Sequence, residues 1–150
     1  MDQIGRKRAG VNEVIPSVLY QRGQFVTWPH DYKRRMLDDL NISVVVNLWL
    51  PVDSDLARVQ HESLIYIAWH IPGDSIPVTA DRMITFIAGL MRDGRRVLVH
   101  CEAGRNRSAW LCARLAANVV GLSRPEAWDL IKRTIPSAKV NRAFELDLQK

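Results

Sequence analysis

Cys101 and Arg107, separated by five residues, are the pair of side chains in this sequence best suited to chemistry on a phosphate group. The thiolate of a cysteine is a nucleophile. The planar guanidinium of an arginine can hold two oxygens of one phosphate at the same time. A nucleophile and a bidentate anion ligand so close together indicate attack by sulfur on a bound tetrahedral oxyanion.

The elements on either side determine where these two side chains lie. Residues 97–99 form a short β-branched run that is typical of a buried strand. Residues 102–106 are polar or small and predict a tight loop. From Arg107 onward apolar residues recur at helical spacing until Gly121, which predicts the end of a helix. Cys101 is therefore expected at the carboxyl end of a strand and Arg107 at the amino end of a helix.

A loop in this position can bind an anion. Successive main-chain N–H groups can point inward and form a cradle, and the helix dipole adds partial positive charge at the same place. Gly104 lets the backbone pass close to a ligand, because glycine has no Cβ. A thiol on the floor of this cradle should ionise easily, since the cradle stabilises negative charge.

The stretch His100-Cys101, five residues and Arg107-Ser108 resembles the signature of the cysteine-dependent protein tyrosine phosphatase superfamily. With Gly104 three places after the cysteine, it is most similar to the dual-specificity branch. The alternative interpretation is a buried structural cysteine beside a solvated basic loop. Less specific segments extend the resemblance over most of the chain: Leu19-Tyr20-Gln21-Arg22-Gly23, the strand Ile42–Trp49, and Val140-Asn141 followed by Phe144 and Leu148.

The resemblance implies a role for each residue of the loop. Cys101 would attack phosphorus and form a phosphocysteine. The Arg107 side chain and the main-chain N–H groups of the loop would hold the three equatorial oxygens. Ser108 would hydrogen-bond the sulfur and ease its departure in the second step, and His100 would order the loop through backbone bonds. The phosphate-binding residues would be Glu102, Ala103, Gly104, Arg105, Asn106 and Arg107.

The leaving oxygen needs a proton, and the resemblance implies an aspartic acid on a separate loop. Asp74 is the best candidate, because it lies in a loop bounded by Pro and Gly directly after a predicted strand. Its carboxylate would activate water in the second step. Asp53, Asp55 and Asp81 are the alternatives. Asp81 fits better as a cap of the helix predicted at 79–93, a role that Thr79 could also fill.

Strands alternate with helices from residue 42 to 121, which predicts parallel pairing and helices on both faces. We therefore expect a single α/β domain whose central, mostly parallel sheet has four to five strands, as in dual-specificity phosphatases. The strand at 18–20 is expected near an edge, because Pro16 precedes it. Strands are predicted at 18–20, 42–49, 64–69 and 97–99, and helices at 31–40, 53–62, 79–93, 107–120, 123–135 and from Lys139 onward.

The composition is that of an ordinary globular domain, with 150 residues, 47% hydrophobic and 25% charged. Residues 1–13 predict a flexible basic arm, and residues 14–150 a dual-specificity phosphatase catalytic domain. No apolar run reaches membrane-spanning length, and the first residues lack the apolar core of a secretory signal. Cys101 and Cys112 would make a poor disulfide framework, so a cytoplasmic setting is expected.

The net charge of +5 suggests anionic partners without choosing among them. No stripe of Lys and Arg interleaved with aromatic residues occurs, so general nucleic-acid binding is not expected. His30 and His61 have no neighbours at metal-ligand spacing, and neither a metal nor another cofactor is expected. The sequence leaves the oligomeric state open.

Three further residues have competing interpretations. Arg105 would raise the positive potential of the loop and favour doubly charged or lipid phosphates, whereas Glu102 opposes this effect. The competing view is that both side chains face solvent. Cys112 lies on an otherwise apolar helix face and is expected to be a core thiol; the alternative is a resolving cysteine for oxidised Cys101.

The expected function is hydrolysis of phosphotyrosine, with phosphoserine and phosphothreonine as further candidates, because so short a chain should form a shallow pocket. RNA 5′-triphosphatase and phosphoinositide phosphatase activities are the enzymatic alternatives. The non-enzymatic alternative is an adaptor that binds phosphate without catalysis. The intact set of Cys101, Arg107 and Ser108 argues against an adaptor, since a binding module needs no nucleophile.

Overall fold

The computed structural model describes residues 10–59 and 63–150 and contains a five-stranded sheet. Its strands in chain order are β1 (Asn12–Ile15), β2 (Leu19–Arg22), β3 (Val44–Asn47), β4 (Ile65–Ala68) and β5 (Val97–His100). Across the sheet the order is β1-β2-β5-β3-β4, and only the β1–β2 pair is antiparallel. The predicted α/β class, with a mostly parallel sheet of four to five strands, is confirmed.

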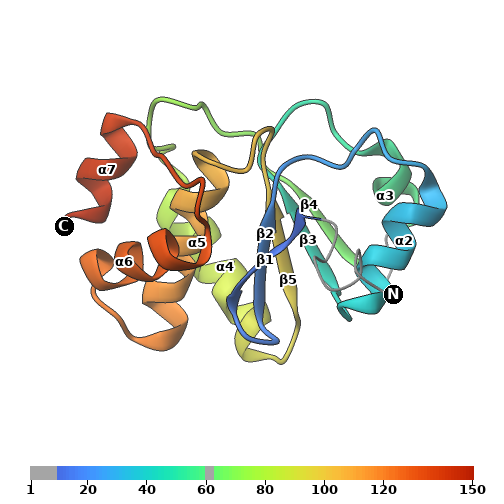
Figure 1. The fold of residues 1–150 in the computed structure, drawn as a ribbon, viewed down its shortest axis with the longest axis horizontal. Coiled ribbons are helices and arrows are strands. Elements are labelled where there is room, and N and C mark those ends of the chain that lie inside the picture. Colours follow the sequence, from blue (N-terminus) through green and yellow to red (C-terminus); the bar gives the residue numbers. More distant parts are fainter. Residues whose placement is uncertain (1–9, 60–62) are drawn as a thin grey trace.

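Helices cover both faces of this sheet (Figure 1). Two of them, α2 (His30–Asp39) and α3 (Ser54–Arg58), lie on one side. The others lie on the opposite side, at the left of Figure 1. They are α4 (Ala80–Arg92), α5 (Arg107–Val120), α6 (Arg124–Thr134) and α7 (Arg142–Leu148). None of the helices in the described part of the chain is both long enough and apolar enough to cross a membrane.

Side chains of the central strands alternate between the two faces, as the pleat requires. Along β5, Val97 and Val99 point into the core that contains α4 and α5. Leu98 points into the second core, which contains Leu37 of α2. Both faces of β5 are therefore buried, which explains why its sequence is an uninterrupted apolar run.

The parallel strands end level with one another. His100 at the end of β5 pairs with Arg22 of β2 on one side and with Asn47 of β3 on the other. The loops that follow these strands therefore gather at one edge of the sheet, where open α/β sheets bind ligands. The loop after β5 is the central one, because β5 is the middle strand of the sheet.

The first strands differ from the prediction. β2 lies inside the sheet and β1 forms the edge, so the expected edge position of residues 18–20 is wrong. Pro16 falls in the turn between the two strands, where it removes no ladder hydrogen bond. β1 begins at Asn12, before the predicted domain start at residue 14. Residues 1–9 of the predicted arm lie outside the described residues.

The helix predicted over residues 53–62 is shorter in the structure. Asp53 caps α3 by accepting a hydrogen bond from Leu56 N at 3.1 Å, and the helix ends at Arg58. Residues 60–62, which include His61, lie outside the described residues.

The last helix begins later than predicted. α7 begins at Arg142 rather than Lys139, because the side-chain oxygen of Asn141 accepts a hydrogen bond from Phe144 N at 2.9 Å and caps the helix. α6 begins as predicted, with Ser123 in a capping box.

Candidate active site

The loop between β5 and α5, residues 101–106, is called the cysteine loop below. It lies against the segment that follows β2. Gly104 has a φ of 73°, and an added Cβ would come within 2.5 Å of the Gly23 nitrogen. Only glycine satisfies both the left-handed conformation and this close approach. Gln24 N also donates to Glu102 O at 2.8 Å, so the segment after β2 fixes the path of the cysteine loop.

Cys101 directly follows β5 and exposes only 2% of its surface. Its sulfur lies 3.3 Å from the hydroxyl oxygen of Ser108 in the first turn of α5. The sulfur is thus beside the amino end of a helix, where the helix dipole favours negative charge. A substrate phosphate would have to reach the floor of the cysteine loop to meet this sulfur.

Ser108 is fully buried and receives a hydrogen bond from Gln21 of β2, with 2.7 Å between Nε2 and Oγ. The same nitrogen of Gln21 donates to Gly104 O at 2.7 Å. The side-chain oxygen of Gln21 accepts from Asn12 Nδ2 at 2.8 Å. Gln21 therefore connects the sheet both to the cysteine loop and to the hydroxyl beside the sulfur.

His100 is fully buried at the end of β5. Its Nδ1 lies 3.3 Å from Cys101 O, and its ring centroid is 4.9 Å from that of Phe25. Burial lowers the pKa of His100 from 6.5 to about 4, although the contact with the Cys101 carbonyl acts in the opposite direction. The imidazole is therefore neutral at neutral pH, and its contacts agree with the supporting role implied by the resemblance.

The loop after β4 is attached to the cysteine loop. Arg107 Nη1 donates to Ile71 O at 3.3 Å, and Asn106 Nδ2 donates to Gly73 O at 2.7 Å. Asn141, before α7, also donates its side-chain amide to Gly73 O, and its main-chain N–H donates to Asn106 Oδ1 at 2.9 Å. Three segments that are far apart in the sequence meet at Gly73.

Asp74, the predicted general acid, directly follows Gly73 and is exposed. The hydrogen bonds to Gly73 O hold the backbone of Asp74 next to the cysteine loop. Asp74 thus lies on a loop whose backbone is attached to the cysteine loop.

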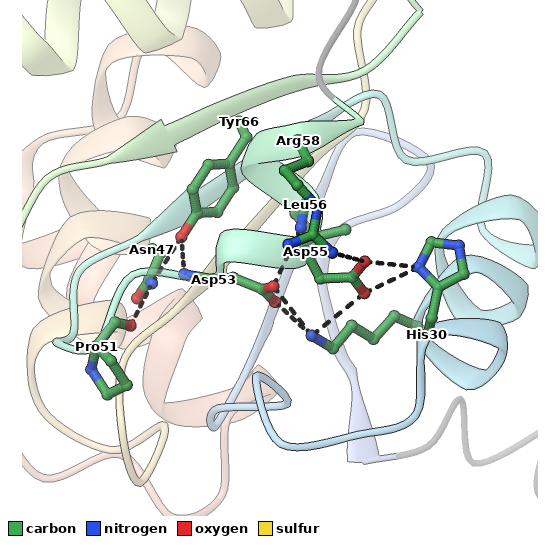
Figure 2. Close-up of polar contacts among 9 residues, drawn as sticks. His30, Asn47, Pro51, Asp53, Asp55, Leu56, Arg58 and Tyr66 are labelled. Atoms are coloured by element: carbon green, nitrogen blue, oxygen red, sulfur yellow. Dashed lines mark hydrogen bonds and ion pairs between the residues drawn. The ribbon is translucent and has the colours of Figure 1, made fainter.

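Asp53 and Asp55 belong instead to a polar network that connects the start of α3 with residues of α2 (Figure 2). The buried Lys33 Nζ lies 3.0 Å from both carboxylate oxygens of Asp53 and 3.6 Å from Asp55 Oδ2. His30 Nδ1 is 2.8 Å from Asp55 Oδ1, and this hydrogen bond lowers the pKa of Asp55. Asp53 N donates to Tyr66 Oη at 2.7 Å. Both carboxylates already have cationic partners, which argues against either as the general acid.

Asp81 does not cap α4 with its side chain. The N-cap residue is Thr79, which makes no side-chain capping hydrogen bond. Asp81 Oδ1 instead accepts from Arg114 Nη2 at 2.8 Å, and this bond lowers the pKa of Asp81. Of the two expected caps, Thr79 therefore occupies the N-cap position and Asp81 does not, because Asp81 is the second residue of α4 and its carboxylate binds Arg114 of α5.

Arg105 and Glu102 both have exposed side chains. Arg105 Nε donates to Ser137 O at 3.4 Å, and its main-chain oxygen accepts from Lys139 N at 2.9 Å. Arg105 therefore contacts the segment before α7. This contact agrees with the solvent-facing interpretation of the pair. Ala103 is also exposed.

Cys112 is fully buried in α5, and both it and Cys101 are free thiols. Burial raises the pKa of Cys112 well above its ordinary value. A protonated thiol among apolar side chains is unreactive, which agrees with the expected core role. Within residues 10–59 and 63–150, no group of three or more His, Cys, Asp and Glu side chains could hold a metal ion.

Gln21 and Asn141 contact the site but are not among its sequence-predicted residues. One feature of the sequence marks Gln21: it is an uncharged polar residue within a strand, between Tyr20 and Arg22. Asn141 shows the spacing of a helix cap to Phe144. Neither signal identifies the partner across the fold, since the partners are distant in the sequence.

Comparison with known proteins places this arrangement in a family. A family model described as dual specificity phosphatase, catalytic domain, matches residues 23–150. Dual specificity protein phosphatase 12 of Mus musculus is 38% identical over 69 residues, which cover 46% of this chain and 20% of that protein. The chain thus spans about a fifth of the length of this curated relative.

Two solved structures share the fold. The crystal structure of human DUSP28 matches with a TM-score of 0.73 and 22% identity, covering 93% of this chain and 90% of that one. The crystal structure of PTPMT1 in complex with PI(5)P matches with a TM-score of 0.75 and 16% identity, covering 93% and 92% of the two chains. Because the family model matches most of the sequence, including the whole cysteine loop, this chain belongs to the dual specificity phosphatase catalytic-domain family.

Proposed function

We propose that this chain hydrolyses phosphomonoesters through a phosphocysteine intermediate on Cys101, with phosphotyrosine in proteins as the leading substrate. The main support is the position of the sulfur, which lies at the end of β5, beside the amino end of α5 and 3.3 Å from the Ser108 hydroxyl. Membership of the dual specificity phosphatase family supports the same reaction.

In the first step the Cys101 thiolate attacks phosphorus opposite the leaving oxygen. The Arg107 guanidinium and the main-chain N–H groups of residues 102–107 hold the three equatorial oxygens. The S–P bond forms, the P–O bond breaks, and Asp74 gives its proton to the leaving oxygen. The hydrogen bond from Asn106 to Gly73 O supports this assignment, because it keeps the acid and the nucleophile on neighbouring loops.

In the second step water attacks the phosphocysteine. The Asp74 carboxylate takes a proton from this water as the new O–P bond forms. The S–P bond breaks, its electron pair stays on sulfur, and inorganic phosphate leaves. The Ser108 hydroxyl, 3.3 Å from the sulfur, donates a hydrogen bond to the departing thiolate.

Phosphoserine and phosphothreonine are included as substrates, since the relatives carry the name dual specificity. A phosphoinositide is the second candidate. One protein with this fold, PTPMT1, holds PI(5)P in its crystal structure.

A turnover panel tests these assignments. It contains p-nitrophenyl phosphate, tyrosine, serine and threonine phosphopeptides, phosphoinositides and triphosphorylated RNA, with Cys101→Ser as the control. Turnover of the tyrosine phosphopeptide that is lost in Cys101→Ser is the expected result. Activity that survives in Cys101→Ser would contradict the cysteine mechanism.

The other substrates separate the alternatives. Hydrolysis confined to phosphoinositides would identify a lipid phosphatase. Hydrolysis of triphosphorylated RNA that does not require Asp74 would identify an RNA 5′-triphosphatase. Phosphopeptide binding without any turnover would identify an adaptor.

We further propose that the catalytic domain extends from β1 to the end of the chain, with the basic residues before it as an arm. The mechanism needs Cys101 to remain a free thiol, as it is in the structure. This requirement fits a reducing setting such as the cytoplasm.

A further inference from the structure

Gln21 is an uncharged polar side chain that is completely buried beside the proposed nucleophile. Its Nε2 lies 2.7 Å from Ser108 Oγ and 2.7 Å from Gly104 O. Both partners belong to the proposed phosphate machinery, yet Gln21 itself comes from the second strand of the sheet. A buried amide with two short hydrogen bonds is a fixed part of its surroundings rather than an incidental neighbour.

The orientation of this amide follows from its partners. Gly104 O is a main-chain carbonyl and can only accept a hydrogen bond. The Gln21 atom facing it must therefore be the NH₂ group, whose two protons serve Gly104 O and Ser108 Oγ. Asn12 Nδ2 completes the set by donating to the Gln21 oxygen at 2.8 Å.

This orientation determines where the Ser108 proton points. A serine hydroxyl has one proton to donate and two lone pairs to accept with. Within the described residues its side-chain partners are Gln21 and Cys101, and Gln21 acts as a donor. The hydroxyl proton is therefore available to the Cys101 sulfur.

The number of hydrogen bonds that the Ser108 hydroxyl can make also depends on whether the Cys101 sulfur is protonated or anionic. If the sulfur carries a proton and donates it to Ser108, the Ser108 proton has no remaining side-chain partner in this part of the described structure. If the sulfur is anionic, the chain from Gln21 N–H through Ser108 O–H to sulfur is complete. A hydroxyl that accepts a hydrogen bond becomes a stronger donor.

We propose that Gln21 is a positioning residue that aims the Ser108 hydroxyl at the Cys101 sulfur and thereby speeds the release of that sulfur from the phosphocysteine. The inference rests on the proposed function. In the step concerned, water adds to phosphorus and its proton goes to the Asp74 carboxylate. The S–P bond breaks with its electron pair remaining on sulfur, and Ser108 donates a hydrogen bond to that thiolate.

The proposal predicts that loss of the Gln21 amide slows hydrolysis of the phosphocysteine but not its formation. Gln21→Met keeps the length of the side chain but removes both donors. Loss of one hydrogen bond to a charged group is expected to lower kcat about tenfold. kcat/KM is expected to stay within about twofold, because it reports formation of the phosphocysteine and not its hydrolysis.

Rapid mixing with p-nitrophenyl phosphate measures the two steps separately. The initial burst of nitrophenol reports phosphocysteine formation, and the steady phase reports its hydrolysis. Gln21→Met, Ser108→Ala and the double variant are compared with the unaltered chain. Tyr20→Phe is the matched control, because it removes the 3.2 Å hydrogen bond to Glu13 from the neighbouring position of the same strand.

The expected result is a slower steady phase with an unchanged burst rate in Gln21→Met, and no additional effect of Gln21→Met when Ser108 is alanine. Equal slowing of both phases, or effects of the two substitutions that simply add, would overturn the proposal. Kinetics of Gln21→Met equal to those of Tyr20→Phe would also overturn it. If thermal unfolding shows that Gln21→Met does not fold, Gln21→Glu takes its place, since a carboxylate cannot donate to Ser108.

Alkylation separates failure of this proposal from failure of the proposed function. If the unaltered chain hydrolyses nothing in the panel, the proposed function fails, but the rate of Cys101 alkylation by iodoacetate can still be measured against pH. Peptide mapping distinguishes Cys101 from Cys112. A shift of the Cys101 alkylation profile toward higher pH in Gln21→Met that disappears in the Ser108→Ala background would support the hydrogen-bond chain, and identical pH profiles would overturn it. The burst rates are compared at a pH on the plateau of this profile, where Cys101 is ionised in both chains.

Discussion

The side-chain amide of Asn106 donates a hydrogen bond to the main-chain oxygen of Gly73, with 2.7 Å between nitrogen and oxygen. Gly73 immediately precedes Asp74, so a residue of the cysteine loop holds the backbone that carries the proposed general acid. Asn141 supplies a second amide to the same oxygen. The loop that carries the proposed acid and the cysteine loop are therefore coupled through the Gly73 carbonyl group.

Replacement of Asp74 by asparagine should remove proton donation to the leaving group. Turnover of a tyrosine phosphopeptide is expected to fall by about 10² to 10⁴, the usual contribution of general acid catalysis. The loss should be smaller with p-nitrophenyl phosphate, because nitrophenolate leaves more easily without a proton. Asp81→Asn is the control, since that carboxylate binds Arg114 instead. Rates of Asp74→Asn close to those of Asp81→Asn would show that another group supplies the proton.

Replacement of Asn141 by serine tests the attachment of the acid loop. Serine caps a helix about as well as asparagine, so α7 should keep its start, but the donor to Gly73 O is lost. We expect kcat with the phosphopeptide to fall about 3- to 10-fold, a fraction of the whole acid contribution. Thermal unfolding measured beside the kinetics separates the two roles. A large drop in the melting temperature with normal kcat would assign Asn141 to stability alone.

The elements around the nucleophile could be predicted from sequence because their signals are local. The apolar run before Cys101 and the helical spacing after Arg107 each depend on neighbouring residues. The capping box at Ser123 is local in the same way. Strand, loop and helix followed from these local patterns, whereas the role of Ser108 was implied by the family resemblance.

The remaining features depend on contacts between distant segments, which periodicity does not encode. Nothing near Gln21 indicates that the cysteine loop will lie 2.7 Å from its amide. The capping expectation for Asp81 is wrong because α4 begins at Ala80, and the carboxylate of Asp81 instead binds Arg114 on another helix. The prediction that residues 18–20 lie at the edge of the sheet is wrong because β1 pairs with β2 and is itself the edge strand. In each case the deciding partner belongs to a different element.

Stability should depend on pH through His100. Burial lowers the pKa of His100 from 6.5 to about 4, so below pH 6.5 the unfolded chain takes up a proton that the folded chain refuses. The free energy of unfolding should therefore fall as the pH decreases from 6.5 to about 4, by up to about 1.4 kcal/mol per pH unit. Above pH 7 His100 should not make the free energy of unfolding depend on pH.

Urea unfolding at several pH values measures this effect. His100→Asn removes the titrating ring, so the difference in unfolding free energy between the unaltered chain and the variant should shrink as the pH falls from 7 to 5. Parallel stability curves through that window would mean that His100 is protonated in the folded protein. Asp55, Asp81 and Glu126 have lowered pKa values and should add their own losses only at lower pH.

The ion pair between Lys33 and Asp53 predicts a large effect on stability (Figure 2). Their side chains are only 3% and 1% exposed, and Lys33 Nζ lies 3.0 Å from both carboxylate oxygens. Lys33→Met would leave the Asp53 carboxylate buried without its closest cation. Removal of one partner of such a pair typically costs about 3 to 5 kcal/mol of unfolding free energy.

A double variant distinguishes this charge effect from simple loss of packing. In Lys33→Met with Asp53→Asn no buried charge remains in the pair, and the asparagine oxygen can still accept from Leu56 N to cap α3. We therefore expect the double variant to be more stable than Lys33→Met alone in urea unfolding. Lys132→Met is the control, because its pair with Asp129 is exposed and should contribute little. The single variant Asp53→Asn is measured as well. If the double variant loses as much unfolding free energy as Lys33→Met and Asp53→Asn together, the two side chains stabilise the fold independently.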